Sequence, residues 1–227
     1  MTYPAISVVI PVFNGAAFLR QAIESVLCQT RPAFEIHVLD DGSTDETPAI
    51  LASFKNRILV TVLAHGGADA ARNAGIKMTR GDFIAFCDAD DLMTPDRLAL
   101  QVRALKDKSE VDFVFGNLVE FEGSAPSFSD PSWTSRRKAG VCVGTLMARR
   151  TALDEVGPFA TRWKMAGFME WYFRIQDGGF KSSVLDDVVL LRRIHGANLS
   201  LTESGAMALE YAQVIKLRSD KKRGKLL

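Results

Sequence analysis

Residues 83–91 read FIAFCDADD, a run of five apolar side chains that stops abruptly at a cluster of carboxylates. A continuous apolar run of this length is typical of a parallel strand covered on both faces. The carboxylates stand where such a strand ends. The stretch therefore predicts a buried parallel strand with an acidic site at its carboxyl end.

The residues before this stretch alternate short apolar runs with amphipathic segments. Such alternation predicts parallel strands joined by helices. Ser43 with Glu46 is expected to form a capping box, and Thr94 before Pro95 to cap a further helix. The expected strands are 6–11, 35–39, 58–63 and 83–87, and the expected helices are 18–28, 47–54 and 70–78.

The pattern changes after about residue 106, and no internal repeat or domain linker stands out. A loop rich in Ser, Pro and Gly is expected over 122–137. We therefore expect one α/β domain. The further strands expected are 111–121, 141–148 and 188–193, and the further helices are 151–156, 169–176 and one from about Ser204.

The composition places the chain among ordinary globular proteins. It has 227 residues, with 28 Lys and Arg against 27 Asp and Glu, and 47% hydrophobic residues. These values exclude a disordered, collagen-like or strongly basic nucleic-acid-binding protein. The three cysteines fit neither a disulfide framework nor a zinc site, which favours a reducing compartment.

No signal peptide precedes the first expected strand, and no apolar segment approaches the roughly 20 residues that span a bilayer. We therefore expect a cytoplasmic protein. The basic tail, residues 216–227, is expected to be a solvated chain end, and at most peripheral contact with an anionic membrane is the alternative.

Polar residues follow three of the expected strands, at Asn14, 40–43 and 88–91. Ligands of an open α/β sheet bind outside the carboxyl ends of its strands, so these loops are expected to meet at one crevice. Crowded carboxylates need a cation, and Asp oxygens suit Mg²⁺ or Mn²⁺, which commonly also bind phosphates. A nucleotide is the expected partner, although 40–45 alone is equally explained as a turn and helix cap.

Several motifs taken together resemble the family 2 glycosyltransferases, which have the GT-A fold. The resemblance is strongest over roughly the first 100 residues and looser beyond them. The motifs are Ile6–Gly15, Gln29-Thr30, Asp40–Asp45, Ala71–Gly75 and Asp88–Asp91, and then Gly144–Met147, Glu170–Arg174 and Arg193–Ser200.

The resemblance implies a metal-dependent, inverting transfer of a sugar from a nucleoside diphosphate sugar, with UDP as the expected nucleotide. The acceptor would be a hydroxyl of a glycan, peptide, lipid or small molecule. The implied fold is a Rossmann-like three-layer α/β/α sandwich with a mostly parallel sheet and a smaller antiparallel region on the acceptor side. Residues 1–106 would bind the nucleotide sugar, 107–203 the acceptor, and 204–227 would form a C-terminal helix and tail.

The resemblance also implies roles for particular residues. Asp90 would ligate the metal ion, Asp88 would reach the ribose or a metal-bound water, and His195 would complete the metal site, with a structural role of His195 as the alternative. One of Arg192 and Arg193 is expected to face the phosphates, because alternation along a strand lets only one do so. The implied nucleotide-binding residues are Pro11, Val12, Asn14, Asp41, Arg72, Asp88, Ala89 and Asp90.

An inverting transfer also needs a base that takes the proton from the acceptor hydroxyl. We predict Glu170, with Asp187 in reserve. The family often has an acidic pair slightly earlier, where this sequence has Gly167 and Phe168. The structural alternative is that Glu170 only pairs with Arg174 on a helix.

Two other functions remain open. A sugar-phosphate nucleotidylyltransferase needs a Gly-rich basic loop after its first strand, and residues 11–15 carry no cation. A nucleotide-sugar-binding module without catalysis is favoured by the missing acidic pair. Trp163 and Trp171 are expected to pack in the core, with an acceptor wall as the alternative, and His65 is expected near the nucleotide without a chemical role.

Overall fold

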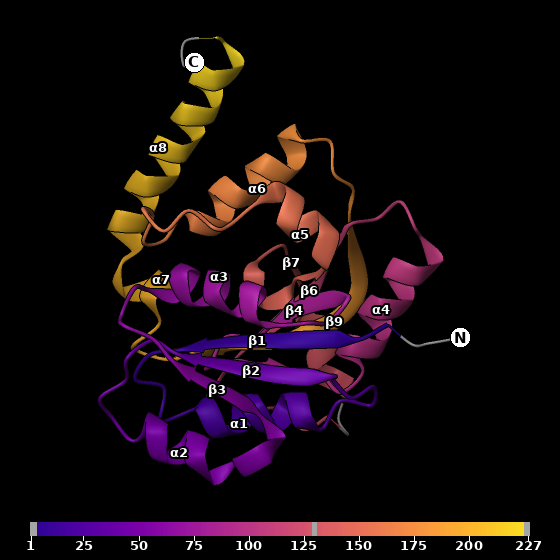
Figure 1. The fold of residues 1–227 in the computed structure, drawn as a ribbon, viewed down its shortest axis with the longest axis vertical. Helices are drawn as coiled ribbons and strands as arrows, with labels where there is room; N and C mark the ends of the chain where they lie inside the picture. Colours follow the sequence, from indigo (N-terminus) through magenta and orange to yellow (C-terminus); the bar gives the residue numbers. More distant parts are fainter. Residues whose placement is uncertain (1–3, 129–130, 225–227) are drawn as a thin grey trace.

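The computed structural model describes residues 4–128 and 131–224 (Figure 1). The strands are β1 (Ile6–Val12), β2 (Glu35–Asp40), β3 (Leu59–Val62), β4 (Phe83–Phe86), β5 (Leu92–Met93), β6 (Phe113–Glu122), β7 (Lys138–Gly140), β8 (Met147–Arg149) and β9 (Ser182–Ile194). The α-helices are α1 (Leu19–Leu27), α2 (Thr47–Ser53), α3 (Ala68–Met78), α4 (Arg97–Asp107), α5 (Arg150–Val156), α6 (Gly167–Asp177), α7 (Leu199–Thr202) and α8 (Ser204–Lys222). Short 3₁₀ helices are η1 (Lys55–Arg57), η2 (Pro131–Arg136) and η3 (Val143–Thr145).

The described strands form one sheet in the order β3-β2-β1-β4-β8-β6-β9-β5, and β7 pairs with β6. The first four strands of this order are parallel. Because β8 is antiparallel to both β4 and β6, and β9 is parallel to β6, both β6 and β9 run in the direction of β4. Six strands therefore end at the same edge. The predicted α/β sheet, mostly parallel with a smaller antiparallel region, is confirmed.

Helices cover both faces of this sheet, with α1 and α2 on one face and α3, α5 and α6 on the other (Figure 1). The apolar run in β4 supplies both cores. Phe83 and Ala85 pack on the side of α1, whereas Ile84 and Phe86 pack on the side of α3 and α6. Successive residues of a strand point to opposite faces, so a strand buried on both sides reads as a continuous apolar run.

Both predicted helix caps are wrong. The Oγ of Ser43 accepts a hydrogen bond from the N–H of Asn14 (2.9 Å), and α2 begins at Thr47 without a side-chain cap. The Oγ1 of Thr94 donates to the carbonyl of Val188 (2.9 Å), and α4 begins only at Arg97. In each case a partner distant in the sequence takes the hydroxyl that a local cap would use.

Two predicted strands in the second half have different limits. Residues 141–148 do not form one strand, because η3 intervenes and β8 covers only Met147–Arg149. The hydroxyl of Thr145 donates to the carbonyl of Cys142 (3.1 Å), which closes this turn locally. β9 begins at Ser182 rather than near residue 188, since its exposed first half pairs with β6.

Helix α8 extends away from the body of the molecule (Figure 1) but is fixed to α6 at two places. The carboxylate of Glu210 accepts hydrogen bonds from the backbone N–H groups of residues 164–166, at 2.7 to 3.1 Å, immediately before α6. At the other end of α6, Asp177 pairs with Arg218 (2.7 Å) and Lys222 (3.1 Å). Both ends of α6 are therefore held by α8.

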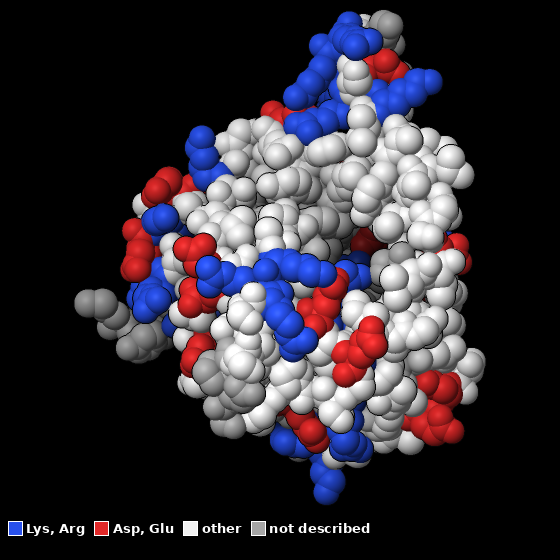
Figure 2. Space-filling model, turned by 180° about the vertical axis from the view of Figure 1, so that it is seen from behind, with Lys and Arg blue, Asp and Glu red and all other residues white. Residues whose placement is uncertain are grey.

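Figure 2 shows Lys and Arg side chains gathered on the projecting end of α8. Two of them, Arg218 and Lys222, face Asp177 rather than solvent alone. The last part of the predicted basic tail, residues 225–227, lies outside the described residues. Within the described ranges, no helix combines the length and the apolar character needed to cross a bilayer.

Candidate active site

The loops after β1 and β2 are joined by hydrogen bonds. Asn14 adopts a left-handed conformation (φ 50°), and its Oδ1 accepts a hydrogen bond from the N–H of Thr44 (2.8 Å). The N–H of Gly15 donates to the Oγ1 of Thr47 (2.9 Å). The predicted nucleotide-binding residue Asn14 thus shapes the loop with a side chain that is already bonded within the protein.

Three other predicted nucleotide-binding residues lie beside this loop. Pro11 and Val12 are buried in β1, and the carbonyl of Val12 accepts the N–H of Asp41 (2.8 Å). Ala89 follows β4, and its Cβ lies 3.6 Å from where a Cβ on Gly15 would be. The loops after β1, β2 and β4 therefore meet at the carboxyl edge of the sheet, as expected from their positions in the sequence.

The buried carboxylate of Asp41 fixes the loop after β3. It accepts hydrogen bonds from the N–H groups of Gly66 (2.9 Å) and Gly67 (2.8 Å), and it lies 2.9 Å from Nδ1 of His65. The ring of His65 faces the ring of Phe13, with centroids 4.1 Å apart. Phe13 is 47% exposed, so the two rings form an open aromatic surface, which we call the aromatic shelf.

Phe13 was missed in the sequence analysis. The signal was present, because an aromatic residue follows a fully buried strand and precedes Asn14 in a turn. Phe13 follows the last strand residue, Val12, and its side chain is not covered by the core. Its exposure at the carboxyl edge is a reason to consider it for ligand binding.

Arg72 on α3 bridges two carboxylates. One terminal nitrogen lies 2.7 Å from Asp69 and the other 2.7 Å from Asp88. Burial lowers the pKa of Arg72, but Asp88 and Asp69 outweigh this effect, so the pKa lies above its ordinary value. The guanidinium therefore stays charged and holds Asp88 at the carboxyl edge of the sheet.

Asp90 lies against the segment after β9. Its Oδ2 is 3.0 Å from Nε2 of His195 and 3.2 Å from Nδ2 of Asn198. Asn198 also accepts the backbone N–H of His195 through Oδ1 (2.6 Å). Residues more than 100 positions apart in the chain thus meet at one carboxylate, and the predicted proximity of His195 to Asp90 is present.

The side chains near Asp90 provide some, but not all, of the ligands that a divalent metal ion needs. Asp90 and His195 offer an oxygen and a nitrogen side by side, whereas Asp88 is turned toward Arg72 through one oxygen. Among the described residues, no three His, Cys, Asp or Glu side chains converge to hold a metal by themselves. This set suits Mg²⁺ or Mn²⁺, since such ions commonly keep water and take further oxygens from a substrate diphosphate.

Asp91 and the two arginines near the end of β9 are already bonded or packed within the protein. Asp91 is buried and accepts the backbone N–H of Arg193 (2.9 Å), and burial raises its pKa well above the ordinary value. The guanidinium of Arg193 is packed over the ring of Phe18, 4.6 Å from its centroid. Arg192 pairs with Glu120 at 3.4 Å. Arg193 and Arg192 are thus each held by a partner within the protein.

A buried cation lies beneath the acidic loop. Arg97 donates to the carbonyls of Gly144 (2.5 Å), Phe86 (3.0 Å) and Leu146 (3.3 Å) and to the Oε1 of Gln101 (3.0 Å). Burial lowers the pKa of Arg97 to about 10, so it remains charged at neutral pH. It ties together the ends of β4 and the turn before β8.

Glu170 lies in the first turn of α6, where its carboxylate is 3.2 Å from Arg174. The start of α6 touches Asp69, since a Cβ on Gly167 would lie 1.9 Å from its Oδ2. A side chain at position 167 would therefore collide with the carboxylate of Asp69. The reserve base, Asp187, is exposed and lies nearer the start of β9 than its carboxyl end.

The two tryptophans considered for the acceptor wall lie in the packed part of the second half. Trp171 is fully buried, and its Nε1 donates to the carbonyl of Gly157 (3.0 Å). The prediction of core packing is confirmed for Trp171. Trp163 is half-buried, with the guanidinium of Arg162 5.3 Å from its ring centroid.

Sequence comparisons match this chain to one family. A model described as Glycosyl transferase family 2 matches residues 7–163. Glycosyltransferase AglE of Haloferax volcanii is 31% identical over 205 residues, which cover 83% of this chain and 66% of that protein. An uncharacterized glycosyltransferase of Rickettsia prowazekii is 37% identical over 111 residues, covering 49% of this chain and 35% of that protein. The chain spans about a third or less of the first relatives it matches.

Solved structures show the same fold. Staphylococcus aureus TarS in complex with UDP-GlcNAc superimposes with a TM-score of 0.69 and 20% identity, over 86% of this chain and 60% of that one. TarS in complex with UDP gives a TM-score of 0.68 and 22% identity, over 84% of this chain and 60% of that one. The expected GT-A fold is therefore confirmed.

Proposed function

The chain belongs to glycosyltransferase family 2, and we propose that it transfers a sugar from a nucleoside diphosphate sugar to an acceptor hydroxyl with inversion at the anomeric carbon. One observation carries the proposal. The aromatic shelf, the Arg72–Asp88 pair and the Asp90–His195 pair all lie at the carboxyl edge of one sheet. A nucleoside diphosphate consists of a base, a ribose and a diphosphate. The aromatic shelf would bind the base, the Arg72–Asp88 pair the ribose, and the Asp90–His195 pair the diphosphate through a metal ion.

A ligand that binds only the folded protein raises its apparent stability in proportion to the logarithm of its concentration over Kd. We expect UDP with Mn²⁺ to raise the melting temperature, and some UDP-sugars to do so as well. UDP is the first nucleotide to test, because the similar TarS structures hold UDP and UDP-GlcNAc. The absence of a shift with every nucleoside diphosphate would contradict the proposal.

The aromatic shelf supports the base of the nucleotide. Stacking of a base on an aromatic side chain contributes about 1–3 kcal/mol. We expect Phe13→Ser to raise the Kd for UDP roughly tenfold to a hundredfold, measured by isothermal titration calorimetry. The matched control is Phe34→Ser, because Phe34 is 64% exposed but precedes β2 at the opposite edge of the sheet. Equal affinities of the two variants would show that the shelf does not contact the nucleotide.

Asp90 and His195 would hold the metal ion, which when bound would stabilise the negative charge that develops on the diphosphate. Asp41 would act on the base through His65 and the loop that its buried carboxylate holds, and Arg72 would hold Asp88 toward the ribose. The remaining nucleotide contacts would come from the surfaces of Pro11, Val12, Asn14 and Ala89. Residues 1–106 then supply most of the donor site.

Glu170 is the proposed base, which takes the proton from the acceptor hydroxyl as its oxygen attacks the anomeric carbon. General base catalysis contributes about 10²- to 10⁴-fold, so Glu170→Gln should lower kcat by that factor and leave the Kd for UDP unchanged. UDP release in the presence of acceptor and calorimetry with UDP measure the two quantities. Asp187→Asn is the comparison variant.

Transfer that survives in Glu170→Gln but is lost in Asp187→Asn would assign the base to Asp187. The pairing of Glu170 with Arg174 favours the second candidate function, a module that binds nucleotide sugar without catalysis. That module would bind UDP-sugar but release no UDP, either with acceptor or by hydrolysis. The same assay therefore separates the two functions.

A further inference from the structure

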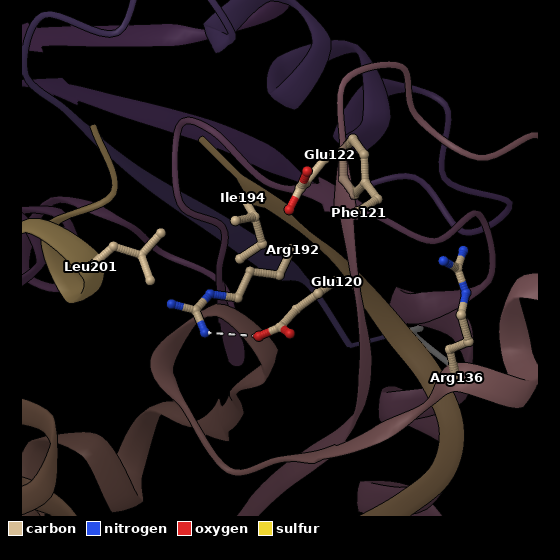
Figure 3. A pocket seen from close by; sticks show the side chains of 7 residues that line it. All are labelled: Glu120, Phe121, Glu122, Arg136, Arg192, Ile194 and Leu201. Carbon is tan, nitrogen blue, oxygen red and sulfur yellow. Dashed lines mark hydrogen bonds and ion pairs between the residues drawn. The ribbon is translucent and has the colours of Figure 1, made fainter. Parts of the chain in front are cut away.

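A pocket of about 740 Å³ lies beside the carboxyl ends of β6 and β9, apart from the residues assigned above to the donor. Its volume is in the range of pockets that hold small molecules. Figure 3 shows Leu201 of α7 at one end, Arg136 of η2 at the other, and Arg192 and Glu120 joined between them. The lining residues are Glu120, Phe121, Glu122, Arg136, Arg192, Ile194 and Leu201.

The pocket adjoins the proposed donor site through one continuous segment. Ile194 immediately precedes His195, and α7, which carries Leu201, begins just after Asn198. Both His195 and Asn198 contact Asp90. Because β6 and β9 run in the direction of β4, the pocket also opens at the edge where Asp90 stands.

The register of β6 and β9 places the polar lining on one face of this strand pair. Glu120 pairs with Arg192 and Glu122 pairs with Ile194, so these four side chains share a face. The residues between them face the other way, where Arg193 packs on Phe121 with 4.6 Å between the guanidinium and the ring centroid. Four of the seven lining residues therefore lie on one face of this strand pair, and Phe121 lies on the other.

The lining carries two carboxylates and two guanidiniums, so it has no net charge. Glu120 is held by Arg192 (3.4 Å) and also contacts Lys138. Carboxylates accept hydrogen bonds from hydroxyls and guanidiniums donate to them, while Ile194 and Leu201 add apolar surface. A hydroxyl-rich ligand without a net charge matches this lining better than an anion or a cation.

We propose that this pocket binds the acceptor, and that the acceptor is a neutral glycan or glycoside. The inference rests on the proposed glycosyl transfer and adds the substrate class for it. Hydroxyls of the acceptor would bond to Glu122 and Arg136, and the apolar face of a sugar ring would lie against Leu201. The pocket would present the acceptor from the β6 and β9 side of the crevice.

The test measures UDP release from a UDP-sugar with three sets of probes, namely neutral methyl glycosides of mono- and disaccharides, glucuronic acid and glucosamine. Neutral glycosides should increase UDP release above hydrolysis, and the charged sugars should not. Glu122→Gln and Arg136→Gln should each raise the KM for the glycoside about tenfold, with the Kd for UDP as in the wild type. Leu201→Trp should fill the pocket and abolish the stimulation.

Glu24→Gln and Arg103→Gln are matched controls, because both residues are exposed on helices away from the pocket. They should behave as the wild type. Stimulation only by charged sugars, or by none of the probes, would overturn the inference while donor turnover upheld the proposed function. Pocket variants with unchanged KM would overturn it too. If the protein released no UDP from any donor, that result would contradict the proposed function itself and, with it, this inference.

Discussion

Asp90→Asn should lower metal-dependent turnover of the sugar donor about a thousandfold, the largest effect on activity that we expect from one substitution. Asparagine keeps the size of the side chain and one oxygen, so the contacts with His195 and Asn198 can be retained. What it removes is the negative charge that would hold the metal ion. The measurement is UDP release as a function of Mn²⁺ concentration.

Asp107→Asn is the control for charge, because Asp107 is exposed in the last turn of α4. It should release UDP at the wild-type rate. The Kd for UDP in the presence of Mn²⁺ should rise in Asp90→Asn, whereas the Kd without metal should be unchanged. Intact metal-dependent binding and turnover in Asp90→Asn would contradict the metal assignment.

Arg97→Met should have the largest effect on stability, a loss of about 3–5 kcal/mol in the free energy of unfolding. Methionine fits the space of the side chain, but it leaves the carbonyls of Phe86, Gly144 and Leu146 without the bonds from Arg97. Buried acceptors without donors are costly. Urea denaturation followed by circular dichroism measures the change.

The matched variant is Arg103→Met, on the exposed side of the same helix. Exposed substitutions of this kind usually change stability by less than about 0.5 kcal/mol. If the two variants unfolded at the same urea concentration, the bonds of Arg97 would contribute nothing net to the fold.

The first half of the fold could be predicted because its signals are local. Each strand of β1 to β4 is a short apolar run, and each connecting helix has a polar side. The strand pattern and the helix pattern can therefore both be recognised in the sequence alone. In the second half, apolar runs such as 113–115 and 188–191 indicate strands but do not show where each strand begins or ends. The first residues of β9 (182–187) show neither an apolar run nor strict alternation and are exposed or half-buried, and their pairing with β6 makes them a strand.

The candidate site was predictable in its location and less so in its contacts. Strand ends placed Asp88 and Asp90 at the carboxyl edge of the sheet. The i,i+3 spacing of Asp69 and Arg72 suits a pair on a helix, but nothing local indicated that Arg72 would also reach Asp88. The hydroxyl side chains of Ser and Thr were the weakest signals, because the sequence did not show which partner each would bond. Ser43 matched a helix cap in sequence, and its actual partner, Asn14, comes from another loop.

The contacts of α8 with α6 limit how far the chain can be shortened from its C-terminal side when a fragment is expressed. The family match ends at residue 163, before α6 and the proposed base Glu170. A fragment that stopped after residue 203 would keep α6 but lose Glu210, and the N–H groups of residues 164–166 would have to find other acceptors. A fragment that keeps both contacts between α6 and α8 therefore has to extend through Lys222, beyond the end of the family match.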